Sequence, residues 1–139
     1  MNKKVVIFGG SGFLGSYLAD ELLRNNFNII IADTQKPKIN HPKQKFVKVN
    51  ILNLKSIKSV IKGAEAVYNL ASLANLDDAA KDPLQTININ VMGNLNLLEA
   101  CRINGKIKRF IYASSAYALS NKGSFYGISK QLSEKLTIE

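Results

Sequence analysis

The sequence of 139 residues contains one cysteine, no tryptophan and three prolines. The single cysteine, Cys101, excludes an internal disulfide and fits a reducing cytoplasm. No apolar run approaches the roughly 20 residues that cross a membrane, and no signal peptide precedes the first predicted strand. Residues able to bind a metal do not occur with ligand spacing. We therefore expect a cytoplasmic protein with no membrane partner and no metal.

Acidic residues are also scarce. Ten aspartates and glutamates stand against 19 lysines and arginines, which gives a formal net charge of +9. A nucleic-acid partner is one interpretation of such an excess. We favour the other, solvated surfaces without a nucleic-acid partner, because the lysines are scattered and are not interleaved with aromatic residues.

The most informative stretch is the apolar run 5–8, followed by Gly9, Gly12 and Gly15. The apolar run predicts a parallel strand that is buried on both faces. Gly9 then allows a tight turn, Gly12 allows a diphosphate to approach the backbone, and Gly15 allows the next helix to press against the strand. The helix N-terminus favours an anion. The stretch predicts a dinucleotide site that includes Phe13 and Leu14.

Alternating strand and helix patterns predict an α/β fold, a Rossmann-type doubly wound parallel sheet with right-handed crossovers. In the first helix, Leu14, Leu18 and Leu22 form the stripe expected to face the core. Asn53 and Asp82-Pro83 are helix starts, and the segments 34–44 and 114–124 are expected to be loops. The predicted strands are 5–8, 28–32, 45–50, 66–70 and 109–113, and the predicted helices are 13–24, 54–62, 83–104 and 126–139.

Asp33 lies 18 positions after Gly15, at the tip of the second predicted strand. A carboxylate there accepts hydrogen bonds from both hydroxyls of an adenosine ribose and repels a 2′-phosphate. An ordinary turn aspartate is the alternative, and the glycine turn upstream favours the ribose role. Asp33 thus predicts NAD rather than NADP, although Lys36 and Lys38 nearby leave room for NADP.

Tyr126 and Lys130 are four residues apart and share one face of the last predicted helix. A tyrosine phenol, with an ordinary pKa near ~10, needs about 4 kcal/mol of differential stabilisation to act as a base near neutrality. A neighbouring ammonium and a bound nicotinamide cation would supply it. Ser114 and Ser115 follow the fifth strand, where sheet tips meet ligands. For Tyr126 and Lys130 an ordinary surface contact is the alternative, and the serines at the tip of the fifth strand favour a catalytic role.

Five segments, in this order, resemble the NAD-dependent epimerase/dehydratase branch of the extended short-chain dehydrogenase/reductase superfamily, which acts on nucleotide sugars. They are the glycine turn with Asp33, and the segments 69–72, 88–94, 112–115 and 126–130. The resemblance covers essentially the whole chain. It implies an NAD-dependent nucleotide-sugar epimerase or reductase that acts by hydride transfer. It also implies a homodimer through helices 83–104 and 126–139.

The resemblance also assigns roles to residues. Asn90 would support the active site, Ser115 would hydrogen-bond the reacting hydroxyl, and Tyr126 would take its proton as a phenolate. Lys130 would hold the nicotinamide ribose and stabilise that phenolate. Asn50 stands where the family usually has aspartate, so it keeps an acceptor and loses the charge. The implied dinucleotide contacts are Gly9, Gly12 and Gly15 at the diphosphate, Asp33 at the ribose, Asn50 and Ile51 at the adenine, and Leu70, Ala71 and Ser72 along the rest.

The chain departs from the family in two ways. In the dehydratases that the chain resembles, the fifth strand is followed by a Thr-Asp-Glu motif whose acids eliminate water. The run Ser115-Ala116-Tyr117 stands there in this chain and contains no acid, which leaves epimerisation or ketone reduction. Members are also normally much longer. We therefore expect residues 1–139 to be an incomplete dinucleotide-binding domain, truncated after the fifth strand and catalytic helix and lacking the C-terminal substrate domain. Such a chain would have little turnover alone. A non-catalytic NAD sensor is the alternative.

Overall fold

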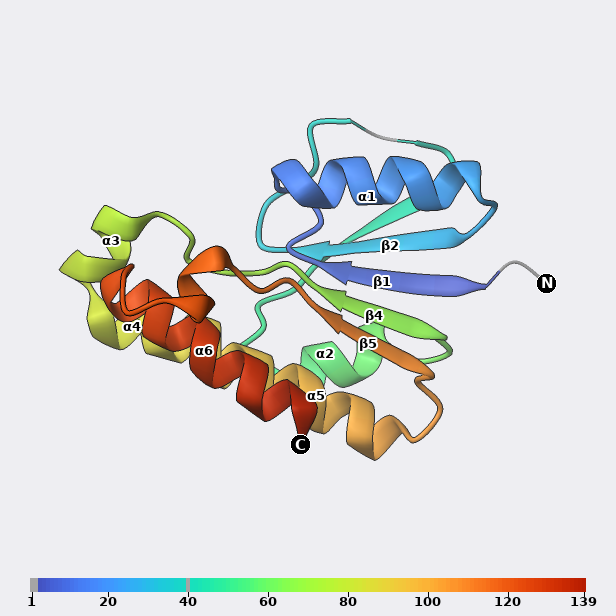
Figure 1. Cartoon of the computed structure of the whole chain (residues 1–139). Coiled ribbons are helices and arrows are strands. Elements are labelled where there is room, and N and C mark those ends of the chain that lie inside the picture. Colours follow the sequence, from blue (N-terminus) through green and yellow to red (C-terminus); the bar gives the residue numbers. More distant parts are fainter. Residues whose placement is uncertain (1–2, 40) are drawn as a thin grey trace.

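The computed structural model describes residues 3–39 and 41–139, in which five parallel strands form one sheet (Figure 1). The strand order is β3-β2-β1-β4-β5, so the chain winds outward in both directions from β1. This order confirms the predicted doubly wound parallel sheet. The strands are β1 (Lys4–Phe8), β2 (Asn28–Asp33), β3 (Gln44–Lys48), β4 (Ala66–Asn69) and β5 (Arg109–Tyr112).

Helices cover both faces of the sheet (Figure 1). One face carries α1 (Phe13–Arg24), and the other carries α2 (Leu54–Val60), α5 (Gly93–Asn104) and α6 (Ser124–Ile138). Val5 and Ile7 of β1 pack in the cluster under α1, whereas Val6 and Phe8 pack in the cluster under α2 and α5. The alternation explains why the run 5–8 is apolar throughout.

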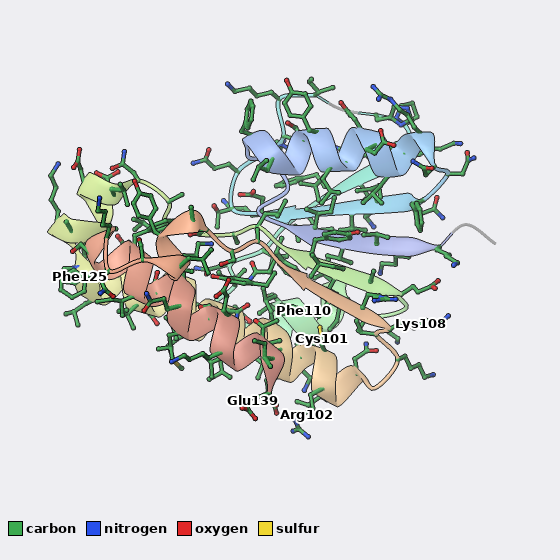
Figure 2. All side chains as sticks on the ribbon, viewed as in Figure 1. Cys101, Arg102, Lys108, Phe110, Phe125 and Glu139 are labelled. Carbon is green, nitrogen blue, oxygen red and sulfur yellow. The ribbon has the colours of Figure 1, made fainter. Side chains whose placement is uncertain are left out.

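Two labelled side chains illustrate the second cluster and its rim (Figure 2). Cys101 of α5 and Phe110 of β5 pack against its buried residues, and burial raises the pKa of the Cys101 thiol to about 11. Arg102, one residue further along α5, is exposed and pairs with Glu99. Cys101 is therefore a core filler rather than a reactive thiol.

The buried stripe of α1 differs from the prediction. Gly15, Ala19 and Leu23 are buried, whereas Leu14 is 64% exposed. The reason is the close contact at Gly15, where a Cβ atom would lie 2.5 Å from the Cα of Gly10. That contact turns the 15-19-23 face toward the sheet and leaves Leu18 and Leu22 at the sides of the core.

The segment between β4 and β5 is more divided than predicted. Residues outside all the predicted strands and helices form α3 (Leu76–Lys81), which Asn75 caps by accepting from the N–H groups of Asp77 and Asp78. The predicted helix 83–104 consists of α4 (Pro83–Ile87), a π-helical turn η1 (Asn88–Met92) and α5. Asp82 caps α4 as expected.

Smaller differences lie near the C-terminal end. A 3₁₀ turn, η2 (Ala116–Leu119), interrupts the expected loop 114–124, and α6 begins at Ser124, two residues before the predicted start. Within the described residues no helix is long and apolar enough to cross a membrane.

Two glycine positions hold the β1–α1 turn together. Gly9 has φ +74°, and a Cβ atom on it would lie 2.5 Å from the backbone nitrogen of Ala71, which follows β4. Gly15 is equally close to Gly10. Gly12, by contrast, would place a Cβ atom no nearer than 3.4 Å, to the carbonyl oxygen of Gly9. The turn is therefore tight on its protein side and open at Gly12.

Replacing Gly15 by alanine should destabilise the chain, because the new methyl group meets backbone atoms that cannot move independently. Overpacking of this kind costs about 1–3 kcal/mol, partly offset by the better helix propensity of alanine. Urea denaturation measures the free energy of unfolding. Gly12→Ala, at the N-cap of α1, is the matched control and should cost less, about 0.5–1 kcal/mol, because it loses only the better capping by glycine and meets no backbone clash. Equal losses in the two variants would contradict this account of the turn.

Candidate functional site

The carboxyl ends of the strands and the loops that follow them line a cavity of about 760 Å³. It lies beside the strands β1 and β4, where the winding direction of the sheet reverses and where ligands bind in open α/β sheets. All the predicted cofactor-binding residues line it. These are Gly9, Gly12, Phe13, Leu14, Gly15, Asp33, Asn50, Ile51, Leu70, Ala71, Ser72, Tyr126 and Lys130. Ser115 and Asn90 are not among its lining residues.

The N-terminus of α1 opens onto this cavity. Gly12 precedes the helix in an extended conformation, and no side chain caps the helix start. The first N–H groups of a helix have no acceptor within it, and the aligned peptide dipoles place partial positive charge there. With no side chain at Gly12, these donors are accessible to an anion in the cavity. The arrangement suits a diphosphate.

Asp33 is fixed in place by backbone donors. One carboxylate oxygen accepts from the N–H of Ser11 at 3.0 Å, and the other accepts from the N–H of Gln35 at 3.1 Å. The carboxylate thus links the β1–α1 turn to the loop after β2. A carboxylate has about four lone-pair positions, so acceptor capacity is left for a ligand in the cavity.

Asn50 and Ile51, the residues expected at the adenine, are partly engaged within the protein. The Asn50 side-chain oxygen accepts from the N–H of Leu52 at 2.9 Å, so part of its acceptor capacity is used within its own turn. Ile51 also lines the cavity, although only 7% of its surface is exposed. These two residues shape the wall of the cavity more than they offer free polar groups.

Lys130 and Tyr126 meet the cavity at its other end. Lys130 is 3% exposed, and its Nζ donates to the carbonyl oxygen of Ala113 at 2.9 Å. Burial lowers the pKa of Lys130 to about 8. The Nζ lies 5.7 Å from the centroid of the Tyr126 ring and 4.9 Å from that of Tyr112. The ring of Tyr126 also meets Tyr117 edge-on, at 6.0 Å between centroids.

Asn90 connects this end to the loop after β4. Its side-chain oxygen accepts from the N–H of Leu73 at 2.7 Å and from the Ser72 hydroxyl at 3.2 Å. Its amide donates to the Ser129 hydroxyl at 2.9 Å. In the same π-helical turn, the carbonyl oxygen of Asn90 accepts from the Ser133 hydroxyl. Asn90 therefore holds α6 against the cavity wall, and π turns are common at functional sites.

Ser115 is used locally in this structure. Its hydroxyl oxygen accepts from the N–H of Tyr117 at 3.2 Å and caps η2, and its neighbour Ser114 is the serine that lines the cavity. The structure therefore does not bring the Ser115 side chain to the cavity wall together with Tyr126 and Lys130. Its catalytic role stays a prediction.

A buried amide pair was missed from the sequence. Asn69, at the end of β4, donates to the side-chain oxygen of Asn94 at 2.8 Å and accepts from the N–H of Ala71 at 3.1 Å. Asn94 in turn donates to the Thr137 hydroxyl and to the Ser133 carbonyl oxygen of α6. Two asparagines within apolar patterns were the available signal. The Ala113 carbonyl oxygen, which accepts from Lys130, belongs to the backbone, so no residue type in the sequence indicates it.

The chain belongs to the NAD-dependent epimerase/dehydratase family, whose family model matches residues 5–139. The UDP-glucose 4-epimerase of Rickettsia bellii is 31% identical over 99% of this chain and 43% of that protein. The structure of an epimerase from Methanothermobacter thermautotrophicus, 27% identical, has a TM-score of 0.89 over 98% of this chain and 46% of that one. The enzyme WbmF of Bordetella bronchiseptica, solved with NAD+, is 26% identical, with a TM-score of 0.88 over 99% of this chain and 45% of that one.

These comparisons agree with the cofactor predicted from the sequence, because the family is NAD-dependent. The residues present fit that group. The uncapped start of α1 at Gly12 suits the diphosphate, and the fixed Asp33 carboxylate suits the adenosine ribose. The chain spans a little under half the length of the relatives that it matches. Within the described residues, no group of three or more histidines, cysteines or acids could hold a metal ion.

Replacing Asp33 by asparagine should weaken NAD binding by roughly tenfold or more, because charge-assisted hydrogen bonds to the ribose are lost. Affinity for NADP should fall less or rise, because the repulsion of the 2′-phosphate is also lost. Calorimetric titration with both nucleotides measures the two constants. Asp77→Asn on α3, which does not line the cavity, is the control. An equal loss for NAD and NADP would indicate a loosened turn and contradict the ribose role.

Replacing Lys130 by methionine should change how stability depends on pH. Between about pH 8 and the ordinary lysine pKa of 10.5, the unfolded chain binds a proton that the folded chain has lost. Lys130 therefore makes the free energy of unfolding rise with pH across this window, by up to about 3 kcal/mol.

Urea denaturation at several pH values measures the difference between the wild type and Lys130→Met. Cys101, whose pKa burial raises to about 11, is present in both proteins, so its contribution cancels. Tyr112 contacts Lys130, so the comparison is made with Tyr112→Phe in both proteins. Lys135→Met, at an exposed position of the same helix, should run parallel to the wild type. A parallel curve for Lys130→Met as well would show that the amine is not held in a desolvating site.

Proposed function

We propose that this chain is the dinucleotide-binding part of a nucleotide-sugar epimerase or reductase that acts through Ser115, Tyr126 and Lys130. One observation carries the proposal: the cavity that holds the glycine turn and Asp33 at one end is lined by Tyr126 and Lys130 at the other. A structural pair on a surface helix would not need to face a dinucleotide site.

Each residue has a distinct task in this proposal. Tyr126 takes the proton of a sugar hydroxyl, and Ser115 hydrogen-bonds that hydroxyl after turning away from its cap on η2. In this proposal Lys130, whose Nζ lies 5.7 Å from the centroid of the Tyr126 ring, holds the nicotinamide ribose and supplies a positive charge near the hydroxyl that loses its proton. NAD, which the glycine turn and Asp33 would hold, would supply hydride transfer at the sugar carbon.

The substrate class follows from the relatives and from one missing acid. The Rickettsia relative is a UDP-glucose 4-epimerase, which favours a nucleotide sugar as the substrate. The run Ser115-Ala116-Tyr117 offers no carboxylic acid to eliminate water, so epimerisation or ketone reduction is favoured over dehydration. Because the chain spans 43% of that relative, we expect little or no turnover of UDP-glucose by these 139 residues alone.

Because the chain spans only 43% of the Rickettsia relative, a second candidate is a module that binds NAD without turnover. Such a sensor would need the glycine turn and Asp33 but would make no use of an ionised Tyr126. The two functions therefore differ in the behaviour of one phenol when NAD+ is bound.

A homodimer through helices 83–104 and 126–139 is part of the proposal. Apolar side chains of these segments lie at the surface, including Met92 and Leu95 on one and Ile128 and Leu132 on the other. Phe125, at the outer end of α6, adds to them (Figure 2). Exposed apolar faces on neighbouring helices are typical of subunit contacts.

Adding NAD+ should make one tyrosine of the chain ionise at a lower pH, because a cation then joins Lys130 beside Tyr126. Ultraviolet difference absorption detects the phenolate, and Tyr126→Phe should abolish the NAD-linked change while still binding NAD+. Tyr17→Phe, on the exposed face of α1, should retain it. NAD+ binding with no change in tyrosine ionisation would favour the sensor and contradict the catalytic proposal.

A further inference from the structure

The side-chain amine of Lys130 is buried and has no acidic partner among the described residues. Its side chain is 3% exposed, and the ion pairs found within residues 3–39 and 41–139 all involve other cations. Its hydrogen bond goes to a neutral group, the carbonyl oxygen of Ala113. Buried charges in proteins are ordinarily paired with an opposite charge. A neutral feature beside the amine is therefore what can favour its charged form at this position.

The ring of Tyr112 is that feature. Tyr112 ends β5, and the centroid of its ring lies 4.9 Å from the Lys130 Nζ. A cation within about 6 Å of a ring centroid is attracted by the electrons of the face, most strongly where water is excluded. The Tyr112 hydroxyl is buried and makes no hydrogen bond of good geometry among the described residues. Its interaction with the Ser133 hydroxyl, which itself donates to the carbonyl oxygen of Asn90, is weak, so hydrogen bonding contributes little to the placement of this side chain.

We propose that Tyr112 is a positioning residue that keeps the Lys130 amine charged and directed into the dinucleotide cavity, its ring face taking the place of a carboxylate. The use of Lys130 rests on the proposed function above. An aromatic face suits that use, because it stabilises the ammonium without cancelling its charge. A carboxylate would hold the same amine in an ion pair and would screen Tyr126 from it.

The surroundings leave the ring as the main support. Burial raises the pKa of Tyr112 to about 12, so this phenol stays neutral while Lys130 titrates. Tyr126 and Glu134 lie on the same helix as Lys130, and Asp33 lines the other end of the cavity. None of these, and no titratable group on the elements packed against α6, forms a recorded ion pair with Lys130. Those groups are Asp77, Asp78, Lys81, Asp82, Glu99, Cys101, Arg102 and Tyr117.

Substitutions at position 112 separate the ring from the hydroxyl. Carbon-13 labelling of lysine side chains allows the pKa of Lys130 to be followed by NMR, with Lys130→Met assigning its signal. Tyr112→Leu should lower the pKa of Lys130 by about one pH unit, a tenfold smaller charged fraction at high pH. Tyr112→Phe, which keeps the ring and removes the hydroxyl, should leave it within about 0.3.

A pKa unchanged in Tyr112→Leu would overturn the proposal, and so would an equal fall in Tyr112→Phe, because the hydroxyl would then be the active group. Phenylalanines of increasing fluorination at position 112 provide a second test that preserves the shape of the ring. Each added fluorine weakens the negative face, so the pKa of Lys130 should fall stepwise. A constant pKa across that series, which decides the matter if Tyr112→Leu does not fold, would assign Tyr112 a purely structural role.

These measurements use the chain without NAD or sugar. Failure of the proposed function would appear as absent NAD+ binding or an unresponsive Tyr126, with the effect of Tyr112 on Lys130 intact. Failure of this inference would leave NAD+ binding and Tyr126 ionisation as proposed and would remove only the dependence on position 112.

Discussion

The close approach of two backbone segments at the carboxyl end of β1 is the constraint on which the rest of the structure depends. Gly9 packs so tightly against the nitrogen of Ala71 that any side chain there would displace the loop after β4. Gly15 packs as tightly against Gly10 and brings the start of α1 to the same place. Because β1 and β4 are neighbours at the point where the sheet reverses direction, this packing leaves a cavity and turns helix donors toward it.

A buried polar network then fixes the opposite wall. Asn69 and Asn94 join the end of β4 to α5 and α6, and Asn90 joins the following loop to Ser129 of α6. Each amide uses both its donor and its acceptor, so the network is satisfied and specifies one position for α6. That position places Lys130 under the cavity. The glycine turn and the amide network thus set the two ends of one site.

The sequence predicted the parts of the fold that follow from hydrophobic periodicity and from residue types with one characteristic structural role, such as a helix-capping aspartate before a proline. The sheet and the cap at Asp82 fall in this class. The residues expected around the dinucleotide line one cavity, and their contacts with it stay a prediction. The prediction from sequence failed where the packing of other elements determines the orientation or the existence of a helix. The side of α1 that meets the sheet is set by contact at Gly15, and α3 is too short to show a helical period. The π turn and the cap made by Ser115 depend on hydrogen bonds between distant segments.

The distribution of charge in the cavity extends this argument from shape to chemistry. Asp33 is the acid among the lining residues, and Lys130 is the cation, at opposite ends of one cavity. A ligand that donates hydrogen bonds at the Asp33 end and accepts them at the Lys130 end would bind in one orientation. That polarity would be lost if a carboxylate stood beside Lys130, since both ends would then attract the same groups. Support of the buried amine by a carbonyl and an aromatic face therefore preserves the direction of binding as well as the charge.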